Sequence, residues 1–479
     1  MYLLPTLAGA ISLAATLPIS FAIPTEIHSR HASTSTLMSH QIPVQDDGSV
    51  SGWVEEPALR GTWKIVWTCL ATTFLCVWTL LCLNVPAPTD TWFILFRRRL
   101  LWMILAILGP EIVLTYAAGQ WSRARHSLAA FRNSGYEGWT MRLAFFADMG
   151  GFVLETAPDP DDNNSSISFP LNAKQLHWLV VNKHVSYPLT TSEEVNDKSK
   201  QDRLAKLITS IQIGYLVVEC IARAAQGLVL TTLELNTLAI VVCSLMTSYT
   251  WLHKPVDVRH PIRLCSPNTL AEITGRRPWD TTPLDFVDEN GPGWALNVQP
   301  FMRMPVLPAE RPLQRIPNDR FPMDPYGSQE YLLCLATLVF TGLHLAAWDF
   351  EFPSRAEQIL WRVSSLVLFL VTAAFWVAET AASWARLGRW RRLYLLMVNP
   401  QKLAMLDLQN SREGEEKATP APRKAIELPL AWEFWTIAPI AFLYGVARLY
   451  QVLEGFLQLR HVDATVFVHI TWSMYFPHL

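Results

Sequence analysis

Long apolar runs are the feature of this sequence that most restricts its fold. About 20 apolar residues in a helix are enough to cross the roughly 30 Å hydrocarbon core of a bilayer. Hydrophobic residues make up 51% of the chain and charged residues only 17%, which is below the share of about 25% in soluble domains. The sequence therefore predicts an all-α fold, a multi-pass transmembrane helical bundle of about six spans joined by large loops. The expected spans are residues 63–83, 100–118, 235–252, 331–347, 359–378 and 434–456.

A further apolar segment, residues 204–228, would make a seventh span possible. Its polar residues Gln212, Glu219, Arg223 and Gln226 form a narrow stripe at helical spacing. This pattern fits a span, a helix lying in the membrane interface, or a helix packed on the bundle. A span would bring Glu219 and Arg223 near the middle of the hydrocarbon, where charges are costly. We therefore predict an interfacial helix, with Glu219 and Arg223 paired at the i, i+4 spacing.

The amino-terminal segment has the pattern of a secretory signal. An apolar run in residues 7–19 leads to Ser20-Phe21-Ala22, with small residues at the positions that signal peptidase reads. Residues 1–22 are thus predicted to be a cleaved signal peptide. Residues 23–60, rich in Ser, Thr and His, are predicted to be a disordered lumenal tail. The chain is expected to enter the secretory pathway and to reside in an endomembrane or the plasma membrane.

Basic residues beside the spans predict the topology, because Lys and Arg gather on the cytosolic side. Six spans and a lumenal amino terminus make Arg97–Arg99 and the arginines after the fifth span cytosolic. Residues 119–234 are then lumenal, 253–330 form a Pro/Arg-rich cytosolic loop, 379–433 form a basic cytosolic loop, and 457–479 form a lumenal tail. Asn163 and Asn164 lie in overlapping N-x-S acceptors and are predicted to be glycosylated. Arg123, Arg125 and Arg132, on the supposed lumenal side, do not fit this scheme.

Ionisable residues inside the spans are candidate functional residues, because each costs several kcal/mol unless it is paired. Glu111 follows Gly109-Pro110, where proline interrupts the helix ladder and frees a carbonyl. Its carboxylate either faces a polar cavity or bonds to the backbone or a basic side chain such as Arg448. Glu234 is interpreted as marking the start of the third span.

His344 and Asp349 form an H-x₄-D pattern, which is similar to the motif of glycerolipid acyltransferases. In that motif the histidine acts as a base and the aspartate orients it. Leu343 stands where that motif has Asn, and a histidine on an apolar helix is more often a core residue. Lys254, after the third span, is either an anchor at the end of a helix or a contact to lipid phosphates.

Several strings together resemble a group of fungal multi-pass membrane proteins that are carried as uncharacterised. The strings are residues 60–63 (RGTW), 109–111 (GPE), 251–258 (WLHKPVDV), 349–353 (DFEFP) and 475–478 (YFPH). The resemblance extends over nearly all of residues 53–479 and supports the membrane class. It implies no activity, ligand or catalytic residue.

Known catalytic and cofactor motifs are missing from the sequence, which contains no GxGxxG, GxSxG, HExxH or P-loop pattern and no Cys/His metal spacing. We therefore assign no catalytic, cofactor-binding or metal-binding residue. The near-neutral charge implies no nucleic-acid partner, so the expected partners are the lipid bilayer and proteins bound through loops 119–234 and 253–330. The leading interpretation is a non-enzymatic scaffold or receptor-like protein. A small-molecule or ion transporter and a lipid-modifying enzyme are the alternatives.

Overall fold

The computed structural model describes a large part of the chain. The described residues are 49–55, 60–158, 166–198, 203–279, 281–287, 311–317, 328–386, 394–395, 397–398, 401 and 431–470. The predicted signal peptide, residues 1–22, and the predicted acceptors Asn163 and Asn164 lie outside the described residues.

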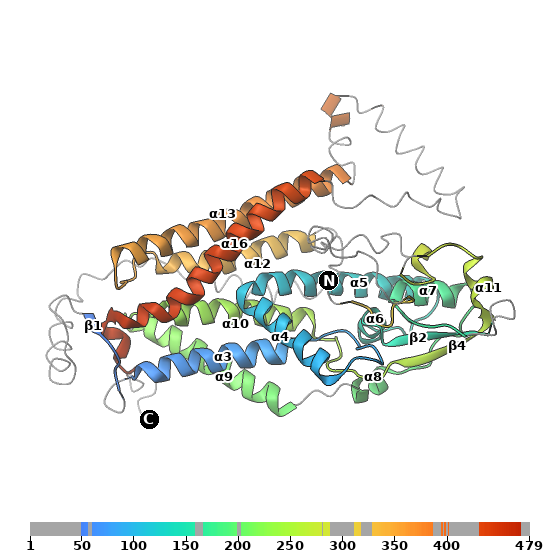
Figure 1. Cartoon of the computed structure of the whole chain (residues 1–479), viewed down its shortest axis with the longest axis horizontal. Helices are drawn as coiled ribbons and strands as arrows, with labels where there is room; N and C mark the ends of the chain where they lie inside the picture. The colour runs from blue at the N-terminus through green and yellow to red at the C-terminus, as the bar shows by residue number, and fades with distance from the viewer. Residues whose placement is uncertain are drawn as a thin grey trace.

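Long helices packed side by side form the larger part of the molecule (Figure 1). These are α3 (Thr62–Leu80), α4 (Trp92–Leu108), α5 (Pro110–Asn133), α9 (Arg203–Ala225), α10 (Thr232–Thr250), α12 (Ser328–Leu343), α13 (Arg355–Arg386) and α16 (Ala431–Leu457). Five helices in the described part of the chain are long and apolar enough to cross a membrane, or six if the bent pair α4–α5 counts as one span. The predicted spans 63–83, 235–252, 359–378 and 434–456 fall on helices that pass this test. The predicted span 100–118 falls on the bent pair, and 331–347 falls on a shorter apolar helix, Leu333–Ala347.

A second lobe with a small β-sheet lies at one end of the bundle, so the all-α prediction is wrong there (Figure 1). Its strands are β2 (Phe152–Ala157), β3 (Ser168–Leu171) and β4 (Ile262–Thr269), in the order β3-β2-β4. Its helices are α6 (Met141–Asp148), α7 (Ala173–Val181), α8 (Ser192–Lys198) and α11 (Leu270–Thr274), with the short 3-10 turn η1 (Asp285–Val287). Along β2 buried and half-buried residues alternate, as expected for a strand with one face on a core. Helix α7 begins with a capping box formed by Asn172 and Gln175.

The pairing of β2 with β4 contradicts the predicted topology of the two large loops. The strands are parallel, with Phe152 opposite Ile262 and Leu154 opposite Leu264. β2 belongs to the loop predicted to be lumenal, and β4 to the loop predicted to be cytosolic. Strands joined by backbone hydrogen bonds cannot lie on opposite sides of a bilayer, so this part of the prediction is wrong. We call this end of the molecule the sheet end.

The opposite end of the bundle, which we call the terminal end, joins the two terminal parts of the described chain. There β1 (Ser49–Ser51) pairs antiparallel with β5 (His461–Asp463), between the turns η4 (Gln458–Arg460) and η5 (Ala464–Phe467). Val50, Ile65 and Val462 are buried in the same small core. Residues 49–51 therefore differ from the disordered tail predicted for 23–60, and residues 458–467 are folded within the predicted carboxyl-terminal tail.

The second predicted span, residues 100–118, is broken at Gly109. The axes of α4 and α5 meet at 112°. Before α4, Val85 donates its backbone N–H to the Met149 carbonyl of the lobe (3.0 Å), and beyond the break α5 continues into contact with α6 and α7. Both outer ends of the pair therefore lie at the sheet end, which is the geometry of a re-entrant pair.

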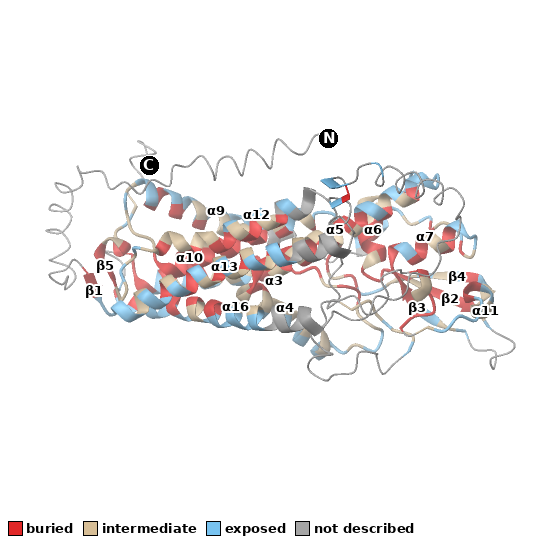
Figure 2. Cartoon of the chain, turned by 90° about the horizontal axis from the view of Figure 1, so that it is seen from above, coloured by how far each residue is buried: buried red, intermediate tan, exposed pale blue. Residues whose placement is uncertain are grey.

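In the bundle, buried residues line the interior and exposed residues cover the outer faces (Figure 2). On α16, Arg448, Gln451 and Glu454 are fully buried. Phe442 is 74% exposed and Leu453 is 53% exposed on the same helix. Large exposed apolar side chains also cover the outer faces of α3, α9 and α13. A helix like α16, with polar residues buried and apolar residues exposed, suits an apolar solvent outside and polar partners inside the bundle.

The 204–228 segment forms α9, which packs along α3 and passes the length and apolarity test for a span. Gln212 donates to the Thr72 hydroxyl of α3 (3.2 Å), so this part of the polar stripe faces the bundle. This arrangement differs from the interfacial helix that the sequence predicts.

Candidate functional site

Buried polar side chains gather in two clusters inside the bundle. The core cluster lies where α4 and α5 meet, and the clasp cluster lies at the terminal end. The core cluster consists of Glu111, Asn236, His344, Tyr444, Arg448 and Gln451, and the clasp cluster of Arg60, Glu219, Arg223 and Glu234. Except for the half-buried Tyr444, every member is buried.

In the core cluster, Arg448 caps the broken end of α4. The bend at Gly109 and Pro110 leaves the last carbonyls of α4 without a continuing helix. The guanidinium of Arg448 donates from Nε to the Leu108 carbonyl (3.2 Å) and from Nη2 to the Ile107 carbonyl (3.4 Å). A charge that is costly inside a bundle is thus used to satisfy backbone acceptors at the end of a broken helix.

The second edge of the Arg448 guanidinium meets His344 and Asn236. Arg448 Nη1 lies 2.7 Å from His344 Nε2 and 3.1 Å from Asn236 Oδ1. His344 Nδ1 lies 3.1 Å from the Phe340 carbonyl. Because a guanidinium only donates, we assign the tautomer in which Nε2 accepts from Arg448 and Nδ1–H donates to Phe340. A neutral His344 fits this site, since an imidazolium would face the guanidinium.

Glu111 lies in the first turn of α5, where a carboxylate is favoured by the helix dipole. Tyr444 donates its hydroxyl proton to the Glu111 carboxylate and also lies 3.4 Å from the Leu108 carbonyl. In the described part of the chain, Glu111 and Arg448 are linked through Tyr444 and this shared carbonyl. The structure therefore brings Glu111, His344 and Arg448 into one cluster, as the sequence suggested for two of them.

The H-x₄-D pair does not form a catalytic dyad. His344 is fully buried with both ring nitrogens engaged in the core cluster. The Asp349 side chain is 88% exposed and pairs with Arg362 (3.2 Å). The resemblance to the acyltransferase motif thus lacks the geometry that the motif needs.

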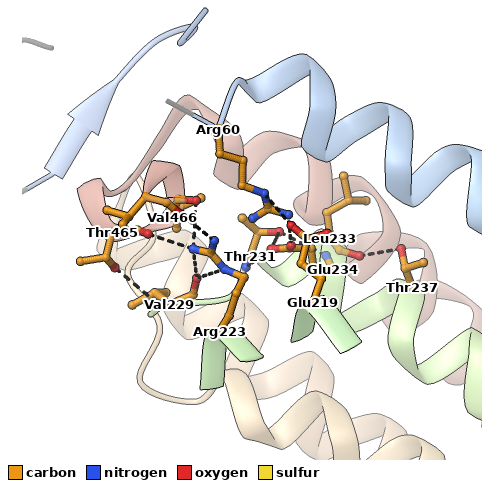
Figure 3. Close-up of polar contacts among 11 residues, drawn as sticks. Arg60, Glu219, Arg223, Val229, Thr231, Leu233, Glu234, Thr237, Thr465 and Val466 are labelled. Carbon is orange, nitrogen blue, oxygen red and sulfur yellow. Dashed lines mark hydrogen bonds and ion pairs between the residues drawn. The ribbon is translucent and has the colours of Figure 1, made fainter. Parts of the chain in front are cut away.

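The clasp cluster centres on Arg60, which lies between two carboxylates (Figure 3). Its Nε is 3.2 Å from Glu219 of α9, and its Nη2 pairs with Glu234 of α10. Glu234 also closes a capping box with Thr231 at the start of α10. Arg60 lies just before α3, so this one side chain holds three helices together.

Arg223 belongs to the clasp cluster through backbone carbonyls (Figure 3). It donates to the carbonyls of Thr465 (2.8 Å), Val466 (3.0 Å), Val468 (3.0 Å) and Val229 (3.0 Å). The predicted ion pair between Glu219 and Arg223 is therefore wrong. The i, i+4 spacing permits the pair, but Glu219 instead pairs with the buried Arg60, and Arg223 instead donates to backbone carbonyls.

Hydrogen bonds along α16 connect α10 with the rest of the interior. Thr232 donates to the Gln458 side chain (2.6 Å from the hydroxyl), and Asn236 donates to the Gln451 carbonyl (3.0 Å). Sequence reasoning missed Asn236, Tyr444, Gln451 and Gln458. A signal was present, because polar residues at 444, 448, 451 and 458 recur at spacings that keep them on one helix face.

Lys254 is a buried cation between the bundle and the lobe, which does not fit the alternative of a contact to lipid phosphates. Only 5% of the residue is exposed, and Nζ donates to Gln120 (2.8 Å). The ammonium also lies 4.7 Å from the ring centre of Trp251. Burial lowers the pKa of Lys254 to about 8.

Among the described residues, no group of three or more His, Cys, Asp or Glu side chains is arranged to hold a metal ion. All seven cysteines are free, and five of them are buried.

These features define a mostly helical protein with several membrane-length apolar helices, a polar interior and a lobe with a three-stranded sheet. The chain belongs to the DUF8562 family, a family of unknown function, whose family model matches residues 33–273 and 329–479. No curated protein and no solved structure matches the chain.

Proposed function

We propose that the chain is an integral membrane protein crossed by α3, α9, α10, α12, α13 and α16, with α4 and α5 entering and leaving at the sheet end. Exposed apolar side chains on the outer helix faces support this arrangement, because lipid is the solvent that such faces suit. An even number of crossings also agrees with the pairing of β1 and β5, which keeps both terminal segments on one side.

We infer that the sheet end faces the cytosol. Arg97–Arg99 lie at the start of α4 and Arg123, Arg125 and Arg132 lie in the outer half of α5, all toward the sheet end. The terminal end carries fewer basic side chains, among them Arg355 and Arg460. Under the positive-inside rule this bias makes the sheet end cytosolic and accounts for the three arginines of α5 that the predicted topology left unexplained.

We further propose a non-enzymatic, receptor-like or scaffolding function that couples the bundle interior to the cytosolic lobe. The observation that carries this proposal is the continuity of α5, a helix of 24 residues that has Glu111 of the core cluster in its first turn and that packs against α6 and α7. A helix is stiff along its axis, so a small shift at the Gly109 break moves the lobe. Protein partners would then bind one composite surface, because loops 119–234 and 253–330 share the lobe.

Hydrogen exchange of the full chain in nanodiscs tests this coupling. Tyr444→Phe removes the donor to Glu111 and loosens the break, whereas Tyr450→Phe on the same helix removes a donor to the Glu357 carbonyl of α13 (3.0 Å). We expect Tyr444→Phe to raise exchange in residues 119–148 by about fivefold, which corresponds to one lost hydrogen bond of about 1 kcal/mol. The control should leave this region unchanged. Faster exchange confined to residues 105–115 would reject the coupling.

A transporter is the second candidate, and the re-entrant break favours it. Interrupted helices with buried ionisable groups are the usual place for ion and substrate sites in membrane bundles. In proteoliposomes, this function requires a solute or proton flux that Glu111→Gln abolishes without loss of folded protein. Flux that is unaffected by this substitution would count against a role of Glu111 in transport.

A further inference from the structure

Glu454 on α16 is buried without a hydrogen-bond donor. The residue is fully buried, and neither carboxylate oxygen accepts a hydrogen bond. The neighbouring hydroxyl of Tyr450 donates its proton to the Glu357 carbonyl (3.0 Å). A buried carboxylate normally has several donors, because its desolvation is otherwise uncompensated.

A second carboxylate, Glu357, lies beside it in the first turn of α13. Glu357 and Glu454 repel each other electrostatically, and both act on Tyr450. Glu357 Oε1 accepts from Arg460 (2.5 Å), but Oε2 is buried and has no donor. Three carboxylate oxygens without donors thus belong to two glutamates that Tyr450 links, one at the start of α13 and one near the end of α16.

The chemistry of these acceptors fits a cation. One arginine faces two carboxylates, so negative charge remains, and the Arg460 side chain is 57% exposed. Among the described residues, the groups that act on Glu454 are Glu357, Tyr450 and Arg460, none of which is a thiol or an imidazole. An all-oxygen set of two carboxylates and a hydroxyl is the set that hard divalent cations prefer.

We propose that Glu357 and Glu454 form a site for a divalent cation of the Ca²⁺ type at the terminal end of the bundle. Glu454 supplies both oxygens, Glu357 supplies Oε2, and the Tyr450 hydroxyl completes the protein ligands. Ca²⁺ accepts this irregular oxygen geometry more readily than Mg²⁺, which demands a near-ideal octahedron. The bound ion replaces the missing donors and ties α13 to α16.

Terbium luminescence of the full chain in nanodiscs of neutral lipid tests the site, because Tb³⁺ substitutes for Ca²⁺ and is sensitised by a nearby tyrosine or tryptophan. We expect saturable Tb³⁺ emission that Ca²⁺ displaces, and a rise in the thermal midpoint when Ca²⁺ is added. Glu454→Gln should weaken the Tb³⁺ affinity by at least about tenfold. Glu137→Gln, which removes an exposed carboxylate in the lobe, is the matched control and should bind like the unchanged chain.

Glu357→Gln keeps the test decisive if Glu454→Gln folds poorly, because its side chain is partly exposed and only one of its oxygens is without a donor. It too should weaken Tb³⁺ binding by at least about tenfold. The proposal is overturned if Tb³⁺ emission does not saturate, or if the glutamine variants bind like the control. A thermal midpoint that rises on acidification but is indifferent to Ca²⁺ would also overturn it, since the carboxylates would then be neutralised by a proton.

Discussion

Two buried arginines donate hydrogen bonds to backbone carbonyls where a helix ends or the chain is irregular. Arg448 satisfies the carbonyls at the end of α4, and Arg223 satisfies carbonyls of the carboxyl-terminal segment. Neither forms a direct ion pair with the carboxylate considered from the sequence, which is Glu219 for Arg223 and Glu111 for Arg448. A guanidinium has five donors in a fixed fork, so it can serve several carbonyls at once, which an ammonium cannot do with the same geometry.

Substitution of Glu111 separates a structural role from a proton- or ion-carrying one. We expect Glu111→Gln to be nearly silent, because the amide oxygen can still accept from Tyr444. Glu111→Leu should destabilise the fold by about 1–3 kcal/mol by stranding the Tyr444 hydroxyl. Folded yield and thermal midpoint measure both effects, with Glu137→Leu as the exposed control. A glutamine variant that folds but fails to complement a deletion phenotype would favour the transporter.

Lys254 predicts a pH dependence of stability. Burial lowers its pKa to about 8 in the fold from its ordinary 10.5, so between these values the unfolded chain binds more protons than the folded chain. Stability from this group therefore rises as the pH increases from about 8 towards 10.5. Thermal midpoints should show this rise in the unchanged chain and in Lys183→Met, an exposed control, but a smaller one in Lys254→Met. Equal slopes in all three would contradict the assignment.

At the scale of an element, α16 combines an apolar outer face with a polar inner face. Its apolar content is enough to predict a span from the sequence, as it is for α3, α10 and α13. What the apolar content does not predict is the partner of each inner side chain. Gln451 meets Asn236 and Ser365, which lie 215 and 86 residues away in sequence. Spacing within one helix carries no information about such distant partners.

Two glycines of α16 test how closely it packs on α10. A Cβ at Gly455 would lie 3.2 Å from Asn236 Nδ2 and 3.4 Å from Leu233 Cα, whereas a Cβ at Gly445 would meet nothing within 4 Å. Gly455→Ala should destabilise the bundle by about 1 kcal/mol or more. Gly445→Ala should be neutral or stabilise it by up to about 1 kcal/mol through helix propensity. A thermal midpoint that falls in Gly455→Ala but not in Gly445→Ala would support the close contact, and equal shifts in both variants would contradict it.

At the scale of the whole molecule, the parallel pairing of β2 with β4 determines which loops share a compartment. The three connections that follow α3, α5 and α10 all reach the sheet end. A topology built from Arg clusters alone placed two of these connections on opposite sides. The arrangement that we propose explains the disagreement, because α4 and α5 together have the apolar length of one span but both outer ends of the pair lie at the sheet end.

Glycosylation mapping tests the proposed orientation. Asp47→Asn creates an N-x-S acceptor with Ser49 just before β1, at the terminal end. We expect this variant to acquire a glycan that endoglycosidase removes, while the natural acceptors at Asn163 and Asn164 stay unmodified on the cytosolic side. The mobility of the expressed protein before and after endoglycosidase measures both. A glycan on Asn163 or Asn164 would invert the orientation and restore the lumenal assignment of that loop.

Local composition by itself determined which segments become long apolar helices and where Pro110 breaks one of them. These features depend on neighbours a few residues apart, so a single sequence contains the information. The tertiary structure alone decided that α5 turns back into a lobe, that β2 pairs with β4, and that Arg60, Arg223 and Arg448 bind where they do. Each of these contacts joins residues far apart in the chain, and its free energy depends on burial and hydrogen bonding that exist only after the helices have packed.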